Sequence, residues 1–422
     1  QPAAAPQLLF MEAAAAEAHV RLTKTGLPLV EIAAFRRSLT LSSATLALIA
    51  CGVPAGSEMS EQLRGDTLVL RARGAEVPTA PREELRLSGD QPHIMLGEVT
   101  ALAALPDGGV VVFDARNSRG LALLEFDARG TLVRVLGRQG SGPGEYGSSF
   151  IRLAVHGDGT VFLHDLVHNR INRYRQGSPL PAVRMPSSLG GGLAGTQFLV
   201  LRDHSVLLNG SLRVQQTLGA PYFVRVDSNG TLIDSVVARG SWMTPAESEL
   251  YGADEMVAAH PDGGWVHFRT DRIGFLRRDA RGTVLLTAEV SGSAPWFRPE
   301  ERRELQRIEE WSAAGRRPAR DVPARKQLVR EGLVDPNGRL WVQRTTEAFR
   351  IPSELKYWGT RGRVHVSWGE PVRLAGFEAS GRYLGEWIFP VRSRVAIYGN
   401  TVWAVMPDSL DVPTLVKYSL DP

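Results

Sequence analysis

The chain has 422 residues, and its 43 glycines and 26 prolines are too frequent for a helical protein. Its formal net charge is +4, from 49 basic and 45 acidic residues that are mixed along the sequence. A nucleic-acid-binding protein would instead gather basic residues on one element. We therefore expect an all-β protein with no nucleic-acid partner. The single cysteine excludes a disulfide within the chain.

Residues 1–51 are interpreted as a signal peptide that ends at this cysteine. A basic pair, Arg36 and Arg37, precedes an apolar stretch that is too short to cross a membrane as a helix. The stretch ends in Leu-Ile-Ala-Cys at residues 48–51, which resembles the bacterial lipobox. The resemblance implies lipidation of Cys51, export, a cell-envelope location and a membrane partner through the lipid anchor. A buried cysteine in a short apolar helix is the alternative.

The segments on either side of this motif are assigned separately. Residues 1–35 precede the basic pair by more than a signal peptide allows, so we interpret them as an upstream extension of the gene or a tag. Residues 52–65 are small and polar, and we expect them to tether the folded domain to the lipid. The domain itself is expected at residues 66–422.

Within residues 66–422, pairs of short apolar runs recur around tight turns. Aspartate, asparagine and glycine occupy these turns because the backbone there needs a positive φ or a side chain that bonds its own main chain. A repeat of about 40–50 residues built from short strands is typical of a propeller, in which each repeat is one blade. The six first turns are Asp107-Gly108, Asp158-Gly159, Asp203, Asp262-Gly263, Asn337-Gly338 and Gly399-Asn400.

A second turn follows in each of the first five repeats, which gives four strands per blade. These turns are Asp127 to Gly130, Gln176-Gly177, Asp227 to Gly230, Asp279 to Gly282 and Glu378 to Gly381. The sixth repeat has only three strands, so a strand from before the first blade should complete it and close the ring. Residues 84–89 are the expected closing strand, beside residues 415–420. Residues 68–73 are the alternative.

The loops of the expected propeller divide into two sets. The turns inside the hairpins are short, whereas the blade crossings and the loops between second and third strands are long and meet at the other face. The longest crossing should hold a short helix near 298–312, because Pro299 is followed by two glutamates and then by Leu305, Ile308 and Trp311 at a spacing of three. Since loops held by a rigid scaffold carry function, the long-loop face is the expected binding surface.

Two repeats carry a family resemblance. Residues 161–174 read Val-Phe-Leu-His-Asp-Leu-Val-His-Asn-Arg-Ile-Asn-Arg-Tyr, and Asp114, Asn117 and Arg119 hold similar places one repeat earlier. Residues 271–273 keep Asp-Arg-Ile. This pattern resembles the NHL repeat. The loop Gly-Arg-Gln-Gly-Ser-Gly-Pro-Gly-Glu-Tyr at 137–146 resembles that of bacterial six-bladed propeller lipoproteins, NHL-like or TolB-like in fold, and the likeness covers about residues 66–422.

The ligand-binding hypothesis rests on arginines in the long loops. Several guanidinium groups with few acids would suit an anionic or carboxylate-bearing ligand, whether a protein or a small molecule. The alternative is that each arginine pairs with an aspartate of a neighbouring blade, such as Asp114, Asp165 or Asp271. The expected ligand-binding residues are Arg116, Arg119, Arg138, Glu145, His168, Asn169, Arg170, Arg272, Arg344 and Trp358.

An enzymatic alternative also follows from the resemblance, because related NHL-like hydrolases and lyases hold a cation in the central channel. His156, His260 and Asp335 occupy equivalent places before the first turns of three blades and are candidate ligands for a divalent cation. A polar residue there can equally stabilise the turn. The sequence contains neither a Gly-x-Ser-x-Gly nor a His-Glu-x-x-His motif, so the leading interpretation is a lipid-anchored binding scaffold and no catalytic residue is assigned.

Overall fold

The chain divides into two units, residues 1–54 and Ala55–Pro422. The computed structural model describes residues 59–64, 67–73, 77–87, 96–117, 120–147, 151–185, 198–210, 213–214, 217–218, 222–237, 255–313, 318–359, 362–391, 394–407 and 412–420, all in the second unit. The expected signal peptide and Cys51 therefore lie outside the described residues. No helix among those residues is long and apolar enough to cross a membrane.

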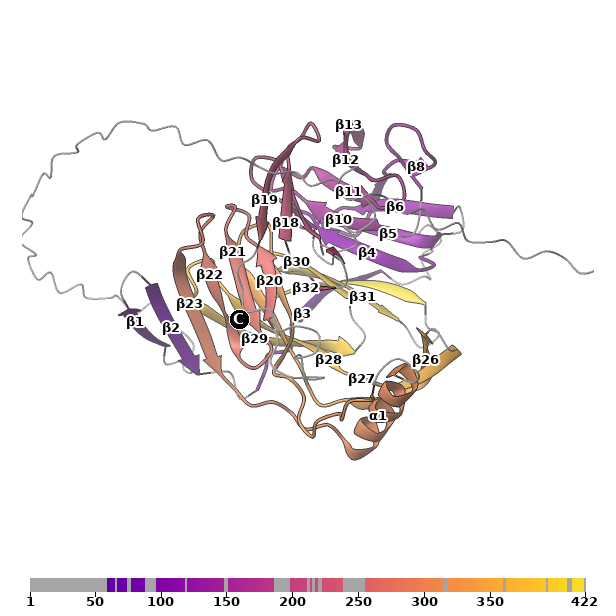
Figure 1. Ribbon diagram of the computed structural model, residues 1–422. Helices are drawn as coiled ribbons and strands as arrows, with labels where there is room; N and C mark the ends of the chain where they lie inside the picture. Colours follow the sequence, from indigo (N-terminus) through magenta and orange to yellow (C-terminus); the bar gives the residue numbers. More distant parts are fainter. Residues whose placement is uncertain are drawn as a thin grey trace, which may run out of the picture. The chain divides into compact units, whose positions relative to one another are not determined.

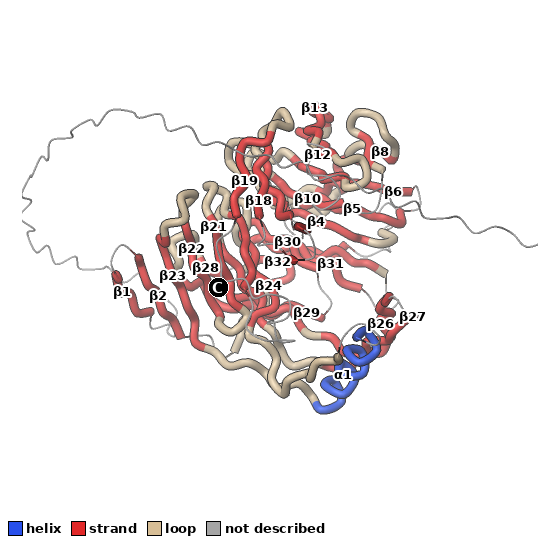
Figure 2. The backbone as a smooth tube through the Cα atoms, viewed as in Figure 1, coloured by secondary structure: helices blue, strands red, loops and turns tan. Residues whose placement is uncertain are grey.

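The described chain is built almost entirely of strands, with a single helix (Figure 2). They form six four-stranded blades in a propeller arrangement (Figure 1), so the predicted fold class is confirmed. Blade one contains β4 (Val99–Ala104), β5 (Val110–Asn117), β6 (Gly120–Phe126) and β7 (Leu132–Val135). Blade two contains β10 (Ile151–Val155), β11 (Val161–Asp165), β12 (Arg170–Arg175) and β13 (Ser178–Arg184).

The remaining blades follow the same antiparallel order. Blade three contains β14 (Phe198–Val200), β15 (Val206–Gly210), β18 (Tyr222–Val226) and β19 (Leu232–Val237). Blade four contains β20 (Glu255–Ala259), β21 (Trp265–Arg269), β22 (Ile273–Arg278) and β23 (Val284–Ser291). Blade five contains β24 (Val329–Val334), β25 (Leu340–Arg344), β28 (Pro371–Phe377) and β29 (Tyr383–Val391). Blade six contains β30 (Arg394–Tyr398), β31 (Thr401–Pro407), β32 (Pro413–Ser419) and β3 (Arg82–Leu87).

Ring closure by an N-terminal strand is also confirmed. β3 pairs antiparallel with β32, and Leu87 lies opposite Leu415. Leu87 is buried while Arg86 beside it is exposed, because successive side chains of a strand point to opposite faces. Leu85 and Leu87 both pack against Gly130 in the second turn of blade one. The closing strand therefore completes blade six and also contacts the first blade.

The alternative closing strand has another place in the fold. β2 (Thr67–Arg73) pairs in parallel with β23 of blade four, and β1 (Met59–Arg64) adds an outer strand to that sheet. Leu70 and Ala72 are buried against blade four, which explains why the alternating pattern of this segment resembles a closing strand. β1 lies inside residues 52–65, which the sequence suggests as a tether, and all its side chains are exposed.

The hydrophobic core lies between the blades. Each of six clusters of buried side chains joins two neighbouring blades, and one of them brings Leu87, Trp403 and Leu415 of blade six together with Val110 and Val112 of blade one. Because the apolar faces of a blade are covered only by its neighbours, the ring of clusters stabilises the blades as one structure.

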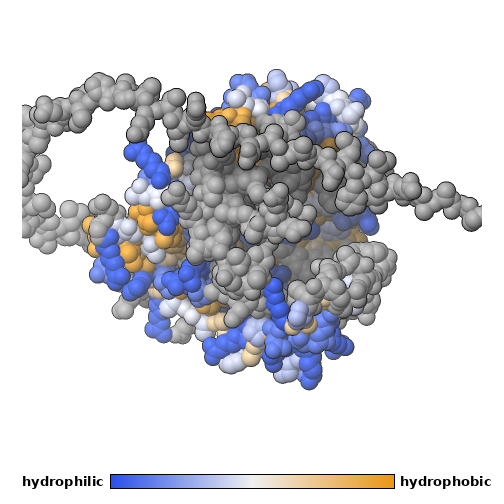
Figure 3. All heavy atoms as spheres, in the orientation of Figure 1, coloured by the Kyte–Doolittle hydropathy of each residue, from blue (hydrophilic) through white to orange (hydrophobic). Residues whose placement is uncertain are grey.

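Smaller elements project from the blades. α1 (Pro299–Ala313) confirms the predicted helix, and hydrophilic residues surround it on the face seen in Figure 3. It is joined to the rest of the insertion by buried Lys326, whose Nζ lies 2.7 Å from a carboxylate oxygen of Glu301 and 2.7 Å from one of Glu370. The short sheets are β8 (Arg138–Gln139) with β9 (Glu145–Tyr146), β16 (Arg213–Val214) with β17 (Thr217–Leu218), and β26 (Phe349–Gly359) with β27 (Gly362–Gly369).

Candidate functional site

Strand register defines the end of the blades at which the predicted site residues lie. The first residue of an inner strand pairs with the last part of the second strand, as in Val99 with Asp114, Ile151 with Asp165, and Val329 with Arg344. The loops that leave the second strands therefore lie at the end where the inner strands begin. We call this the entry end.

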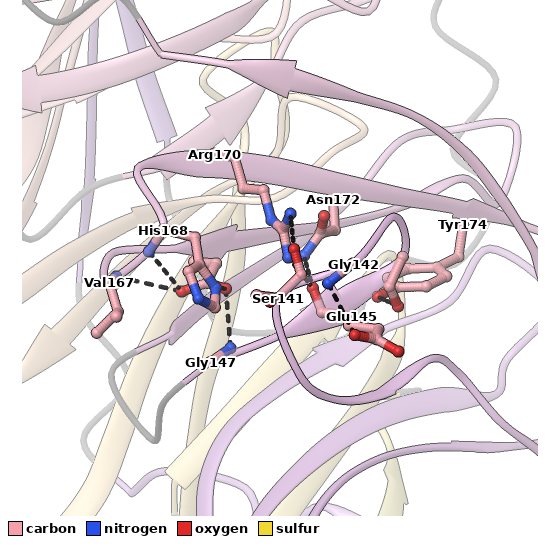
Figure 4. Close-up of polar contacts among 11 residues, drawn as sticks. Ser141, Gly142, Glu145, Gly147, Val167, His168, Arg170, Asn172 and Tyr174 are labelled. Atoms are coloured by element: carbon pink, nitrogen blue, oxygen red, sulfur yellow. Dashed lines mark hydrogen bonds and ion pairs between the residues drawn. The ribbon is translucent and has the colours of Figure 1, made fainter.

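Buried aspartates organise the entry end in blades one and two. Asp114 accepts hydrogen bonds from the backbone N–H groups of Gly97 and Glu98, both at 2.8 Å. Asp165 accepts one from Gly147 at 2.9 Å and one from His168 Nδ1 at 2.7 Å (Figure 4). Burial alone would raise the pKa of Asp165, but the hydrogen bonds from His168 and Gly147 outweigh it and lower that pKa. These carboxylates hold the entering backbone against the second strand.

Five of the predicted site residues lie in and around the glycine-rich loop before blade two, and Figure 4 shows three of them, Glu145, His168 and Arg170. Arg170 donates to the carbonyl oxygens of Ser141 at 2.9 Å and Glu145 at 2.6 Å. The Glu145 carboxylate accepts from Gly142 N at 2.7 Å and from Arg138 Nε at 2.6 Å, and these bonds lower its pKa. His168 and Asn169 lie in the loop leading to Arg170, bonded to Asp165 and, through Asn169 Nδ2, to the Met185 carbonyl. The contacts fold this loop onto blade two.

The other predicted residues pair within their own blades. Arg116 Nε lies 2.7 Å from a Glu98 carboxylate oxygen, and Arg272 Nε lies 3.4 Å from Asp271 Oδ1. Arg344 is buried, and its Nη1 lies 2.7 Å from both carboxylate oxygens of Glu386. Arg119 and the side chain of Trp358 lie outside the described structure. Arg116, Arg138, Arg272 and Arg344 thus each pair with a carboxylate of their own blade or loop, and not with an aspartate of a neighbouring blade.

The cation candidates lie at the opposite end, in the first turns. His156 Nε2 lies 3.2 Å from the Arg202 carbonyl oxygen of blade three, and His260 Nε2 lies 3.2 Å from that of Gly338 in blade five. Asp335 Oδ2 accepts the Gly399 N–H of blade six at 3.2 Å. Burial lowers the pKa of His260 and raises that of Asp335. All three side chains therefore connect the first turn of one blade to that of the next.

A cavity of about 460 Å³ lies on the inner strands of five blades, at the entry end. None of its described lining residues is among the ten predicted ones. Its polar lining is Thr100, Arg152, Glu331, Gln343 and Arg394. A second cavity of about 220 Å³ shares five apolar lining residues with the first and continues along the same inner strands: Leu102, Leu153, Phe198, Leu333 and Val395.

The charges in the larger cavity are unequal. Its described lining has two arginines, Arg152 and Arg394, one carboxylate, Glu331, and no histidine, while the smaller cavity adds the carboxyl group of Asp335. Enclosure by the channel walls raises the pKa of Glu331, which favours its neutral form. His164, on β11, pairs in register with Arg152 on β10. Burial and, to a smaller extent, the positive charge of Arg152 lower the pKa of His164 to about 4. At neutral pH the channel mouth therefore carries a net positive charge.

Charged residues inside otherwise apolar strands could have indicated this channel from the sequence. Innermost strands are otherwise apolar, as in Ile-Arg-Leu-Ala-Val at 151–155, so a charged residue inside one must face the axis or a partner. Glu331 and Arg394 are in comparable strands. The loops drew attention because they hold more arginines, yet Arg116, Arg138 and Arg272 are paired locally.

Comparisons with known proteins found similar solved structures but no matching sequence. No family model and no curated protein matches the sequence. Similar solved structures include a member of the DUF4221 family from Bacteroides vulgatus, 11% identical, covering 80% of this chain and 96% of that one with a TM-score of 0.49. A Bacteroides fragilis protein named "Putative exported protein" is 14% identical, with coverages of 84% and 99% and a TM-score of 0.45.

Virginiamycin B lyase from Staphylococcus aureus is a third similar structure, 11% identical, with coverages of 80% and 98% and a TM-score of 0.37. Likeness at these levels carries no argument about activity. The six-bladed arrangement rests on the strand order and register given above. The finer resemblance to NHL-like and TolB-like lipoproteins stays a prediction.

Proposed function

We propose that this chain is an exported, lipid-anchored propeller that binds an anionic ligand with an apolar portion at the entry end of its central channel. The observation that carries the proposal is the pair of arginines, Arg152 and Arg394, at a cavity that continues into a second one lined by apolar side chains and Asp335. Volumes of about 460 and 220 Å³ suit a small molecule, since such sites commonly measure about 300–1,000 Å³.

The chemistry of the lining supports this ligand class. A guanidinium group pairs with a carboxylate through parallel hydrogen bonds, and the surrounding walls strengthen that attraction. Leu102, Leu153 and Phe198 continue inward from the charged mouth and would cover a hydrocarbon segment. Arg394 donates to the Thr100 carbonyl oxygen, which holds its side chain between blades six and one.

We also propose that the long loops surround the opening of this channel at the entry end. The described members of the predicted set that lie in loops between second and third strands are at the entry end, and Arg138 and Glu145 join them through Arg170. Arg272 lines a separate cavity and is not part of the proposed site. Lipidation of Cys51, followed by the segment ahead of β1, would present this propeller at a membrane surface in the cell envelope. Cys51 is the basis for that part of the proposal.

A thermal-shift experiment with matched ligands tests the binding proposal. Decanoate, below its micelle-forming concentration, should raise the melting temperature, whereas decan-1-ol and acetate at equal concentration should raise it much less because each lacks one half of the recognised group. An equal shift from decan-1-ol and decanoate would contradict a charged mouth. An equal shift from acetate and decanoate would contradict an apolar continuation.

A further inference from the structure

A second cluster of ligand-type side chains lies at the other end of the propeller, between blades two and three. His156, Asp158 and His204 each offer one donor atom, and these atoms lie within 4.8 Å of one another. His156 Nδ1 is 2.8 Å from Asp158 Oδ1, and His204 Nε2 is 3.4 Å from Asp158 Oδ2. The imidazole ring centroids are 3.9 Å apart. One carboxylate therefore faces two imidazoles.

The turns fix both histidines. The His156 N–H donates to the Thr160 carbonyl oxygen at 2.9 Å, and the His204 N–H donates to that of Leu201 at 2.9 Å. His204 has a φ of 63° and stands where the corresponding turns have Gly108, Gly159, Gly263 and Gly338. A non-glycine residue in this left-handed region is strained by the contact between its Cβ and the following carbonyl oxygen. The turn of blade three thus keeps a histidine where glycine would be unstrained.

The hydrogen bonds around His156 and Asp158 leave two acceptor atoms facing each other, a contact that a cation would stabilise. The two ring nitrogens of His156 both face groups that can only accept: the Asp158 carboxylate at 2.8 Å from Nδ1 and the Arg202 carbonyl oxygen at 3.2 Å from Nε2. A neutral ring has one proton, so in either tautomer one ring nitrogen faces an acceptor without a proton between them. A second proton on the ring or a metal ion would relieve this opposition. A hydrogen bond from the ring nitrogen that does not bind the metal, such as one from His156 Nε2 to the Arg202 carbonyl oxygen, orients a metal-binding histidine.

We propose that His156, Asp158 and His204 bind a first-row divalent transition-metal ion, with Zn²⁺ as the best fit, and that this ion joins blades two and three. Two imidazoles and one carboxylate with water as fourth ligand are a common zinc set. In a tetrahedral site with bonds of about 2.0–2.1 Å the donors are about 3.4 Å apart, so modest side-chain rotations suffice. Arg175, whose Nη2 is 3.6 Å from Asp158 Oδ2, is the competing cation.

The blade four to blade five boundary provides an internal comparison. His260 and Asp262 repeat His156 and Asp158, with a Nδ1 to Oδ1 distance of 2.6 Å. The next turn, however, has Gly338 in place of a histidine, and this glycine lies directly against the His260 ring. The third ligand is therefore specific to the boundary between blades two and three.

The test is calorimetric titration of the untagged, EDTA-treated chain with Zn²⁺, together with its melting temperature. We expect one site per chain and a rise of a few degrees under saturating zinc, as for any ligand that binds only the folded state. His204→Gly should abolish both effects while the zinc-free protein melts at the same or a higher temperature, because glycine relieves the turn. Asp158→Asn should weaken zinc binding at least tenfold.

Two results would overturn the proposal. The wild-type chain could fail to bind zinc, which would assign the contact to a protonated His156 paired with Asp158. Alternatively, His204→Gly could bind zinc as tightly as the wild type, which would place the ion on other groups, including the His260–Asp262 pair. Because His204→Gly leaves the channel residues unchanged, the decanoate response should be the same in this variant.

Discussion

Leu87→Ala tests the closure of the ring by its N-terminal strand. Leu87 has 2% of its side chain exposed and lies in the cluster that joins blades six and one. Replacing a buried leucine with alanine removes apolar contacts and leaves a cavity, at a cost of about 2–5 kcal/mol in the free energy of unfolding. We expect the upper part of this range, because the backbone on both sides is held by the β3–β32 pairing and cannot collapse into the space.

Urea unfolding at one temperature measures this change, with Glu83→Ala as the matched control. Glu83 is on the same strand, and its side chain is exposed beside Arg86. The control should lower the free energy of unfolding by less than about 0.5–1 kcal/mol, the usual value of an exposed ion pair. Equal effects of the two substitutions would show that β3 contributes no core and would refute closure through Leu87.

Two further predictions concern the entry end and the anchor. Because the pKa of Asp165 is lowered in the folded state, its ionised form stabilises the fold above the unfolded pKa of about 3.9, and this contribution is lost as pH falls toward the folded value. Asp165→Asn should therefore lose less stability than the wild type between neutral pH and pH 3. Parallel plots of the free energy of unfolding against pH for the two proteins would contradict this. Cys51→Ala should move the protein from the detergent phase to the aqueous phase, since each buried methylene of an acyl chain contributes about 0.8 kcal/mol to membrane binding; an unmodified mature N-terminus in the wild type, measured by mass spectrometry, would refute lipidation.

The fold could be predicted from local chemistry because the blades repeat the same types of turn residue between short apolar strands. The Asp-Gly turns set the hairpins, and the three-stranded sixth repeat required a strand such as β3. β2 could not be placed in this way. Its alternating Leu68, Leu70 and Ala72 suit any apolar sheet edge, and only packing against blade four selects one.

The candidate sites depend on contacts between repeats, which a single-strand pattern does not contain. Arg152 and Arg394 are about 240 residues apart in the chain and meet only because the inner strands surround one axis. The turn at Asp203 lacks the glycine of the other first turns, and the role of His204 there depends on His156 of the preceding blade. Arg344 could not be told from a ligand-binding arginine, because its partner Glu386 is on the outermost strand of the same blade.

The most direct test of the proposed function is the dissociation constant of decanoate for Arg152→Gln, measured by isothermal titration calorimetry beside Arg272→Gln. Arg152 lines the channel, whereas Arg272 lines a separate cavity of about 220 Å³ in blade four. Loss of a charge-assisted contact of about 1.5–3 kcal/mol should raise the dissociation constant about tenfold or more in Arg152→Gln and leave it unchanged in Arg272→Gln. Equal dissociation constants for Arg152→Gln and the wild type would contradict a ligand site in the channel.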